Sequence, residues 1–377
     1  MVRTGMDNLG EERTFKRVFS SNRFSEGAYA ENNINFREIN SDFLLNYSDV
    51  FGEINLDVSV GANRLDQIGG SIQTQAIGLA QPGIFNLENA ASPLEVSQFN
   101  YKKRINSVYG IAKFGFRDFL FVDVTARNDW SSALATPISS ENTDFFYPSV
   151  SASFILSEIA DLPNSISFAK LRASWAQVGN DTDPYQTVGV FSPQTPVAGK
   201  ATFSDQDFIP NNNLLSETST AIEVGADVRF FDDALSFDIS YYQAKNENQI
   251  LALPIPISSG YSQQIINGGT INASGLEVIM GAAPIRNRNF SWTTFLNYST
   301  NTATVEDLPE GEDAVTLAYS RVYDNPNQTV WFIVEEGGQV GDIWGTGYQK
   351  NENGDFIIDE KGDLIVDNTL KKLGNYN

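Results

Sequence analysis

The stretch "LSFDISYYQ", residues Leu235–Gln243, alternates between two kinds of side chain. Apolar or aromatic side chains stand at Leu235, Phe237, Ile239 and Tyr241, and mainly polar ones separate them. Successive side chains of a β-strand point to opposite faces, so the stretch predicts a strand with one apolar and one polar face. Such a strand suits a soluble sandwich, whose apolar face meets a core, and equally a membrane barrel, whose apolar face meets lipid. The connections between strands must therefore distinguish the two.

The same alternation recurs along the chain, whereas helical periodicity is almost absent. Further examples are "INLDVSVGAN", "FLFVDVTARND", "SVSASFIL", "FAKLRASWA" and "AIEVGADVRF". By this rule we count roughly a dozen strands and predict an all-β fold, an antiparallel up-and-down meander within a large transmembrane β-barrel. The strand positions expected to face lipid are Leu120, Val122, Val124, Val150, Phe154, Leu171, Val224, Phe237, Ile239 and Tyr241.

From about Tyr101 onward, the expected connections alternate between short and long. Short turns are expected at Arg117–Asp118, Phe231–Asp233 and Pro284–Asn289, and Ser157–Ser167 is intermediate. Long loops are expected at Asp129–Phe145, Gly179–Glu217, Asn246–Thr270 and Asn301–Gln328. Short turns on one rim and long loops on the other are typical of an up-and-down outer-membrane barrel.

Aromatic residues cluster beside the three short turns. The clusters are Phe114, Phe116, Phe119 and Phe121; Phe230, Phe231 and Phe237; and Phe290, Trp292 and Phe295. Aromatic residues are enriched where barrel strands cross a membrane–water interface. The clusters therefore predict an interfacial aromatic girdle at this rim.

The composition excludes several classes of function. Acidic residues number 47 against 25 basic ones, a net charge of -22 that argues against nucleic-acid binding. The chain has no Cys and no His, which excludes disulfides, thiolate nucleophiles, Cys- or His-based zinc sites and triads with a His base. The chain contains no apolar run of about 18 residues, so the sequence predicts no membrane-spanning helix. We expect no enzyme activity, no cofactor and no metal site, and binding and gating in place of covalent chemistry.

Two further features have alternative interpretations. "NENGDFIIDEKGD", Asn351–Asp363, resembles a calcium loop in its rhythm, but Gly354 comes too early, so hairpin turns at "NG" and "KG" are the favoured prediction. Loop aromatic residues could stack on sugar rings or simply pack within the loops. These residues are Trp130, Tyr185, Tyr261 and Tyr323, and the ligand-binding residues are otherwise unknown.

Several segments together resemble one protein family. "TARNDWSSAL" followed by "FFYPSVSASFILSE" resembles a pair of barrel strands in SusC/RagA-like, TonB-dependent outer-membrane transporters. The following segments are similar to that family in the same order: "KLRASWAQVGND", "ETSTAIEVGADVRFFDDALSFDISYYQAKNENQIL", "INGGTINASGLEVIMGAAPIRNRNFSWTTFLNYSTN", "GGQVGDIWGTGYQ" and "LGNYN". The resemblance extends from about Tyr101 to Asn377.

The resemblance implies a particular architecture. Family members carry an N-terminal plug inside a barrel of ~22 strands. They are energised through a TonB box and pair with a SusD-like lipoprotein. They import oligosaccharides or peptides across the outer membrane of Gram-negative, Bacteroidota-like bacteria. The sequence has no recognisable plug motif, TonB box or signal peptide, so we expect residues 1–377 to be a fragment of the barrel domain that lacks the plug and the final strands.

The sequence therefore predicts part of an outer-membrane TonB-dependent transporter. The expected cargo is a bulky nutrient, preferentially an oligosaccharide, taken up with a SusD-like partner. An open sheet would leave backbone groups unpaired in lipid, so the fragment should not transport by itself. The alternatives are a passive porin-like channel and a soluble carbohydrate-binding β-sandwich.

Overall fold

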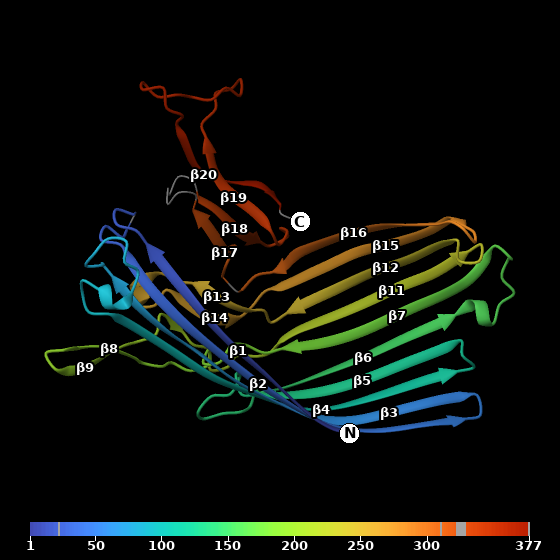
Figure 1. Cartoon of the computed structure of the whole chain (residues 1–377). Helices are drawn as coiled ribbons and strands as arrows, with labels where there is room; N and C mark the ends of the chain where they lie inside the picture. The colour runs from blue at the N-terminus through green and yellow to red at the C-terminus, as the bar shows by residue number, and fades with distance from the viewer. Residues whose placement is uncertain (22, 310, 322–328, 376–377) are drawn as a thin grey trace.

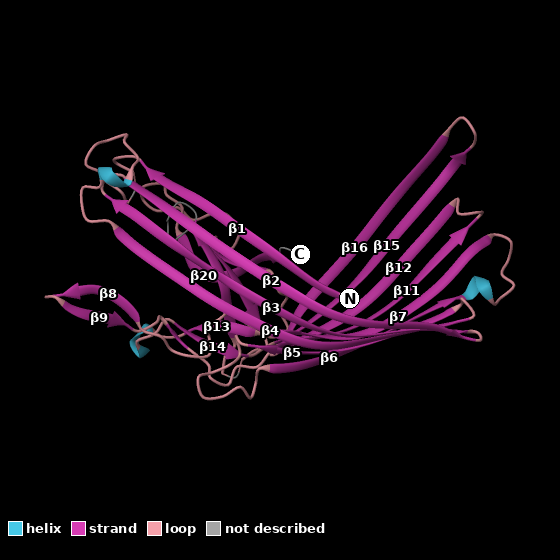
Figure 2. Ribbon diagram, turned by 60° about the horizontal axis from the view of Figure 1, so that its bottom comes forward, coloured by secondary structure: helices cyan, strands magenta, loops and turns pink. Residues whose placement is uncertain are grey.

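One antiparallel sheet dominates the computed structural model, which describes residues 1–21, 23–309, 311–321 and 329–375. Its strands are β1 Val2–Arg17, β2 Ala28–Phe51, β3 Ile54–Ile77, β4 Glu95–Phe116, β5 Leu120–Ser131, β6 Asp144–Ile155, β7 Ile166–Asn180, β11 Glu217–Phe230, β12 Leu235–Glu247, β15 Thr270–Arg286 and β16 Ser291–Asp307. These eleven strands pair in the order of the chain, each antiparallel to its neighbours (Figure 1). The predicted all-β, up-and-down meander is confirmed, and Figure 2 shows that the sheet is a single twisted layer.

The connections lie on two different rims. Four short connections, residues 52–53, 117–119, 231–234 and 287–290, and one intermediate connection, residues 156–165, lie at the right of Figure 1. Long connections span residues 78–94, 132–143, 181–216 and 248–269 on the opposite rim, where residues 18–27 form a further connection as long as 156–165. Arg117 and Asp118 in one short turn have φ values of 49° and 59°, the left-handed conformation that tight hairpin turns require. The alternation predicted from about Tyr101 onward is thus confirmed as far as β16, with residues 156–165 as the intermediate connection.

Smaller sheets are built from segments within the long connections and from the residues that follow β16. Their strands are β8 Ser192–Val197, β9 Lys200–Ser204, β10 Phe208–Ile209, β13 Ile250–Pro254, β14 Gln263–Asn267, β17 Ala314–Arg321, β18 Thr329–Glu335, β19 Asp342–Tyr348 and β20 Val366–Asn375. The prediction of one long loop at Asn301–Gln328 is wrong in its extent, because β16 continues to Asp307 and β17 begins at Ala314. Residues 322–328 of that loop lie outside the described residues. Three short 3-10 helices, Leu87–Asn89, Leu156–Glu158 and Ile257–Ser259, complete the elements, and no helix among the described residues is long and apolar enough to cross a membrane.

The longest strands extend far beyond the thickness of a bilayer. β2 and β3 each contain 24 residues. At about 3.3 Å per residue, each strand is ~80 Å long, whereas a tilted strand needs only about 9–11 residues to cross the hydrocarbon core. Figure 2 shows β1 to β4 reaching outward on the side of the long loops. A membrane around the short-turn end would therefore leave more than half of β2 and β3 in water.

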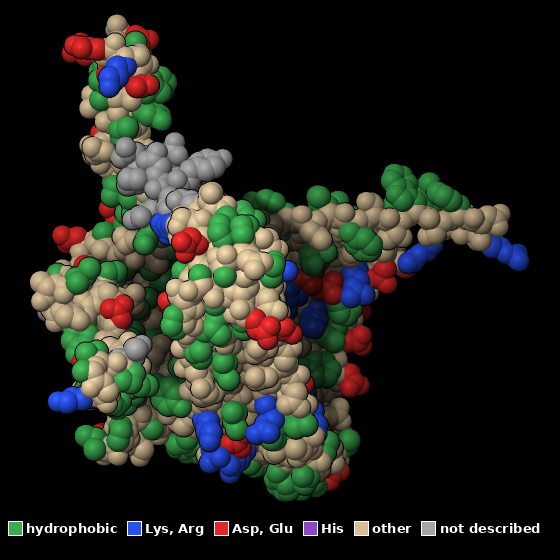
Figure 3. All heavy atoms as spheres, turned by 60° about the vertical axis from the view of Figure 1, so that its left-hand side comes forward, with side chains coloured by type: hydrophobic (Ala, Val, Ile, Leu, Met, Phe, Trp, Pro, Cys, Tyr) green, Lys and Arg blue, Asp and Glu red, His purple; other side chains and the backbone are tan. Residues whose placement is uncertain are grey.

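The protein buries little of its surface. Its accessible surface is 24242 Å², whereas a soluble globular protein of 41.5 kDa would expose roughly 15,000 Å². Most of the buried hydrophobic side chains among the described residues form three small clusters. Figure 3 shows hydrophobic side chains spread over much of the visible surface. A second medium or a further layer of protein must therefore cover the sheet.

The strand register separates two faces of opposite character. Directly paired residues on neighbouring strands share a face, and the next residue along each strand faces the other way. We call outer the face that carries the row Tyr47, Val58, Ala112, Val124, Val150, Trp175 and Ile222. We call inner the face that carries the adjacent row Ser48, Asp57, Lys113, Asp123, Ser151, Ser174 and Glu223. A shift of one residue thus changes a row without formal charge into one with four charged side chains.

All ten positions predicted to face lipid lie on the outer face. Pairing runs from Leu120 through Phe154 and Leu171 toward Ile239 of β12, and Val224 pairs with Tyr241. Leu171 and Val224 are 50% and 49% exposed, and none of the ten is among the buried side chains of the described residues. The single-layer sheet therefore gives no support to the sandwich alternative. Contact of these side chains with lipid remains a prediction.

Two residues of the predicted aromatic girdle are on the other face. Phe114 and Phe116 lie on the outer face, as the girdle requires. Phe121 pairs with Gly115, and Phe295 pairs with Gly281, so both rings belong to the inner face. The prediction grouped residues by their distance from a turn and ignored their alternation along the strand. The girdle hypothesis is therefore restricted to the outer-face members.

Candidate functional site

A polar network crosses the inner face over three strands. Arg172 of β7 binds both oxygens of Asp238 of β12, with Nη2–Oδ1 at 2.7 Å and Nη1–Oδ2 at 3.2 Å. Arg172 also donates to Ser240 Oγ at 2.5 Å, and Nε lies 3.7 Å from Glu223 Oε1. Paired, planar contacts of this kind orient the guanidinium strictly. The network therefore gives the wall a fixed arrangement of charges that water and a ligand can reach.

Gly225 makes this network possible. β11 lies between β7 and β12, and Gly225 is the residue of β11 that pairs with both Arg172 and Ser240. A Cβ atom at Gly225 would lie 2.6 Å from Arg172 Nε and 2.8 Å from its Cζ. The missing side chain thus lets the guanidinium cross one strand to reach the next.

Replacing Gly225 with Val should break the contact between Arg172 and Asp238. Because the side chain of Asp238 is 41% exposed, water partly screens the pair, and we expect a loss of only about 1 kcal/mol in the free energy of unfolding. Urea titration of the membrane-inserted protein measures this loss. Gly5→Val is the matched control, since Gly5 lies in a strand with no atom within 4 Å of its Cβ position. Equal effects of the two substitutions would contradict the role assigned to Gly225.

A second inner network lies nearer the long loops. Asp129 accepts hydrogen bonds from Arg127 Nε at 2.7 Å and from the Tyr147 hydroxyl at 2.6 Å. Arg127 also donates to Ser107 Oγ at 2.9 Å, and its guanidinium lies 5.9 Å from the centre of the Tyr109 ring. Asp129 and Ser107 are buried. Charged and aromatic side chains therefore continue along the inner face toward the loop rim.

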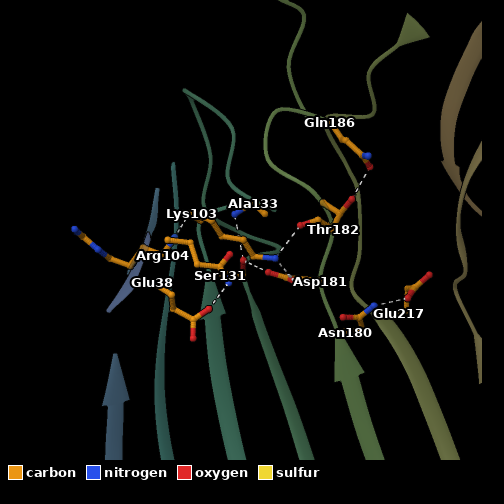
Figure 4. A network of polar contacts seen from close by, with 12 residues as sticks. Glu38, Lys103, Arg104, Ser131, Ala133, Asn180, Asp181, Thr182, Gln186 and Glu217 are labelled. Carbon is orange, nitrogen blue, oxygen red and sulfur yellow. Dashed lines mark hydrogen bonds and ion pairs between the residues drawn. The ribbon is translucent and has the colours of Figure 1, made fainter. Parts of the chain in front are cut away.

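A buried ion pair joins β4 to the root of the longest loop (Figure 4). Lys103 Nζ lies 2.6 Å from Asp181 Oδ1 and donates to Thr182 O at 3.1 Å. Ser131 at the end of β5 donates to the other oxygen of Asp181 and accepts from Ala133 N at 3.2 Å. The side chains of Lys103 and Asp181 are only 15% and 9% exposed. This contact fixes the positions from which residues 132–143 and 181–216 leave the wall.

The long loops pack on one another above the wall. Leu134, Leu214 and Ile265 come from three different loops and form one buried cluster. Asn267 strengthens it: its Nδ2 donates to Leu215 O at 2.9 Å, and its Oδ1 accepts from Leu215 N at 2.8 Å. A cavity of about 390 Å³ opens beside the cluster, between residues 134–142 and loop 181–216. The loops therefore form one assembly with room for a ligand group.

Substituting Leu214 with Ala should loosen this loop assembly. Leu214 is completely buried, and a large-to-small change at such a site costs about 3 kcal/mol. We expect faster hydrogen exchange in residues 181–216 and 248–269, with unchanged exchange in the wall strands. Leu215→Ala is the matched control, because the side chain of Leu215 is 44% exposed. Slower or unchanged exchange in Leu214→Ala would contradict the packing role.

The four aromatic residues considered for sugar stacking do not form one site. Trp130 pairs with Asn106 and Asp144 on the outer face, because it alternates in step with Val124, so it points away from the inner wall. Tyr185 accepts a hydrogen bond from Lys102 N, and Tyr261 donates to Asp205 at 2.9 Å, a contact that raises the pKa of the Tyr261 hydroxyl. Tyr323 lies outside the described residues. Sequence reasoning also missed Lys103 and Asp181, which only the register brings together.

The segment Asn351–Asp363 forms the predicted hairpin turns. Asn351 Oδ1 accepts from the backbone N–H groups of Asn353 and Asp355, and Asp359 Oδ1 does the same for Lys361 and Asp363. Each side chain closes its own turn, as Asn and Asp commonly do. Within the part of the chain that the structure describes, no group of three or more acidic side chains could hold a metal ion. The favoured prediction, hairpin turns at "NG" and "KG", is therefore confirmed.

Comparisons with known proteins agree with this wall-and-loop arrangement. The family model described as TonB dependent receptor-like, beta-barrel matches residues 7–370. The chain belongs to this family of outer-membrane receptor barrels. Its relatives are named as TonB-dependent receptors, and one solved structure of the same fold is a peptide transporter.

The chain matches only a part of the length of each individual relative. TonB-dependent receptor P3 of Formosa agariphila is 29% identical over 318 residues, which are 82% of this chain and 31% of that protein. TonB-dependent receptor SusC of Bacteroides thetaiotaomicron is 23% identical over 231 residues, or 58% of this chain and 22% of that one. The solved RagAB peptide transporter shares the fold with a TM-score of 0.77 at 16% identity, covering 98% of this chain and 41% of that chain. The chain thus spans less than half the length of each of these relatives.

Proposed function

We propose that this chain forms part of the wall and loops of a SusC/RagA-type importer in the outer membrane of a Bacteroidota-like bacterium. The protein takes up a bulky nutrient, with an oligosaccharide as first candidate and a peptide as second. The observation that carries the proposal is the contrast between the two adjacent rows of the sheet, one uncharged and one charged. Such a wall suits lipid on one side and an aqueous lumen on the other.

The open edges of the sheet support a larger closed barrel. β1 and β16 each have one neighbouring strand, so apart from backbone hydrogen bonds that Ala303 and Val305 make to residues 337–340, their outer edges have no partner strand among the described residues. Unpaired backbone groups are costly in lipid, and closure removes them. We propose that the intact protein adds the missing wall strands and a plug that contacts TonB, so that residues 1–377 are one part of its barrel domain.

We further propose that the long loops contact a SusD-like lipoprotein. The loop hairpin β8–β9 projects from the rim (Figure 1) and carries the exposed side chains Phe191, Val197 and Phe203. Their exposed fractions are 72%, 66% and 63%. Exposed apolar clusters of this kind mark protein contacts. Replacing both Phe residues with Ser should reduce the lipoprotein that co-purifies, while the barrel remains inserted.

Uptake by cells tests the import function. We expect labelled oligosaccharide to enter in a TonB-dependent way, and entry to stop when the gene that encodes this chain is deleted. A labelled peptide of similar size, given in a parallel assay, distinguishes the two classes of cargo. Recovery of the protein in the soluble periplasm, or absence of heat-modifiable migration, would contradict the proposal.

A passive porin-like channel is the second candidate, because the inner networks would also line an open pore. The two functions differ in their energy requirement. A porin would conduct cargo in cells that lack TonB, and purified protein would form open pores in planar bilayers. An importer whose lumen is filled by a plug should do neither.

A further inference from the structure

The outer face of β2 to β4 changes character at a defined height. On β3, the outer positions from Ile54 to Ala62 are apolar, and the next outer position is Arg64. The apolar stretch covers about nine residues, the length that a tilted strand needs to cross the hydrocarbon core. On β4, the apolar positions that end at Val108 are likewise followed by Asn106 and Arg104. Arg64 and Arg104 therefore stand where these strands would leave the lipid tails.

Four basic side chains gather at this height, and we call them the basic cluster: Arg37, Arg64, Lys102 and Arg104. Arg37 and Lys102 both pair with Ile68, one outer row beyond Asp66 and Arg104. Neighbouring strands are ~4.8 Å apart and successive outer positions ~7 Å apart, so the four side chains form one patch over three strands that extends ~14 Å along them. Asp66 is the one acidic side chain within it.

The basic cluster is not neutralised by its own protein. Asp66 accepts from Arg64 Nε at 2.7 Å and from Arg104 Nε at 2.5 Å. These contacts occupy one nitrogen of each guanidinium, and the two Arg side chains remain 52% and 51% exposed. Among the described residues, the terminal nitrogens of these two Arg side chains donate no hydrogen bond to another side chain. Four positive charges thus surround one carboxylate in a chain whose net charge is -22.

A basic residue elsewhere on the outer face behaves differently. Lys245 of β12 lies two outer positions beyond Tyr241, near the end of the apolar stretch of that strand. Its Nζ lies 3.0 Å from Glu247 and 3.8 Å from Glu306. That cation is therefore balanced by two carboxylates, whereas the basic cluster has an excess of positive charge.

We propose that the basic cluster binds phosphate groups of the lipid headgroups in the outer leaflet that surrounds the barrel. The inference rests on the proposed function, because it requires the outer face to meet a membrane. The cluster stands at the edge of the apolar band, where headgroup phosphates lie. Guanidinium groups match phosphate oxygens in a paired geometry, and each cation near an anionic surface adds to the attraction. The lipid bound there is an anionic, phosphate-bearing one, such as phosphorylated lipid A.

The test uses the transporter purified from its native outer membrane. The variant Arg64→Gln/Arg104→Gln should carry about tenfold less phosphorylated lipid than the wild type, measured by native mass spectrometry. Lys245→Gln is the matched control and should retain the wild-type amount. Equal lipid retention by the double variant would overturn the proposal. Heat-modifiable migration of all variants confirms an inserted barrel, so a failed lipid result is distinguishable from a failed membrane assignment.

Two further measurements keep the proposal open to refutation if the double variant does not fold. Wild-type protein in nanodiscs should retain lipid A that carries phosphate and lose lipid A from which phosphate has been removed. Asp66→Asn should increase retention, because it frees both guanidinium groups from their internal partner. Equal binding of both lipids, or displacement of bound lipid by millimolar inorganic phosphate, would contradict a site for lipid headgroups.

Discussion

Placing an arginine at Val124 should destabilise the inserted barrel by about 2–4 kcal/mol, since a charge at the middle of a lipid-facing band loses its hydration. Val124 lies in the central apolar row of the outer face and is 41% exposed in the sheet. The free energy of unfolding, measured by urea titration in lipid vesicles, gives the loss directly.

Thr125→Arg is the control for this substitution, one residue away on the same strand. Thr125 belongs to the inner face, where its hydroxyl lies 2.7 Å from Ser149 Oγ. An arginine there meets water and other polar groups, so we expect a loss below about 1 kcal/mol. If Thr125→Arg proved as damaging as Val124→Arg, the two faces would not differ in environment, and the account of the wall would be wrong.

Replacing Lys103 with Met should release the longest loop from the wall. The substitution leaves the carboxylate of Asp181 buried without its cation, and breaking one side of a buried pair costs about 3–5 kcal/mol. Because the pair joins a strand to a loop, the loss should appear locally. Hydrogen exchange should accelerate at residues 131–133 and 181–186 while β4 and β7 stay protected.

Two further variants make this result specific. Lys102→Met changes the preceding residue, whose side chain is on the outer face, and should leave loop exchange unchanged. Adding Asp181→Asn to Lys103→Met removes the buried carboxylate that has lost its cation, and it should restore part of the protection from hydrogen exchange. Faster exchange in Lys102→Met, or no recovery in the double variant, would mean that the ion pair does not hold the loop.

The wall between β5 and β12 was predictable because each strand there has one apolar and one polar face. Residues such as Phe237 and Asp238 alternate strictly, and the turns between the strands are short. β1 and the first half of β2 gave no comparable signal, since their few apolar side chains, such as Leu9, Ile34 and Ile39, are divided between the two faces among mainly polar ones. Strands that stand in water on both sides need no apolar face, and backbone pairing with β3 holds β2 along its whole length. Alternation therefore detects the part of a barrel strand suited to lipid and misses the rest.

The residues of the candidate site were harder to predict for a different reason. Lys103 and Asp181 are separated by 78 positions, and Asp181 is one of 47 acidic residues. Only the register and the course of the loop select this pair from the many that the sequence allows. Gly225 is similar, because a glycine in a strand could mark a bulge, a bend or a crossing side chain. The sequence predicts the two faces of the wall, and the structure is needed to identify which charges meet.

Single cysteines along β12 test the central claim most directly, and the chain contains no cysteine of its own. A fluorophore is attached in turn at positions 237 to 242, and the protein is inserted in vesicles that contain brominated lipid. Brominated lipid quenches the fluorescence only of labels that are in contact with it. The account predicts quenching of labels that replace Phe237, Ile239 and Tyr241, and bright emission from labels that replace Asp238, Ser240 and Tyr242. Uniform quenching, or the opposite alternation, would contradict the assignment of the outer face to lipid. It would thereby also contradict the proposed import function.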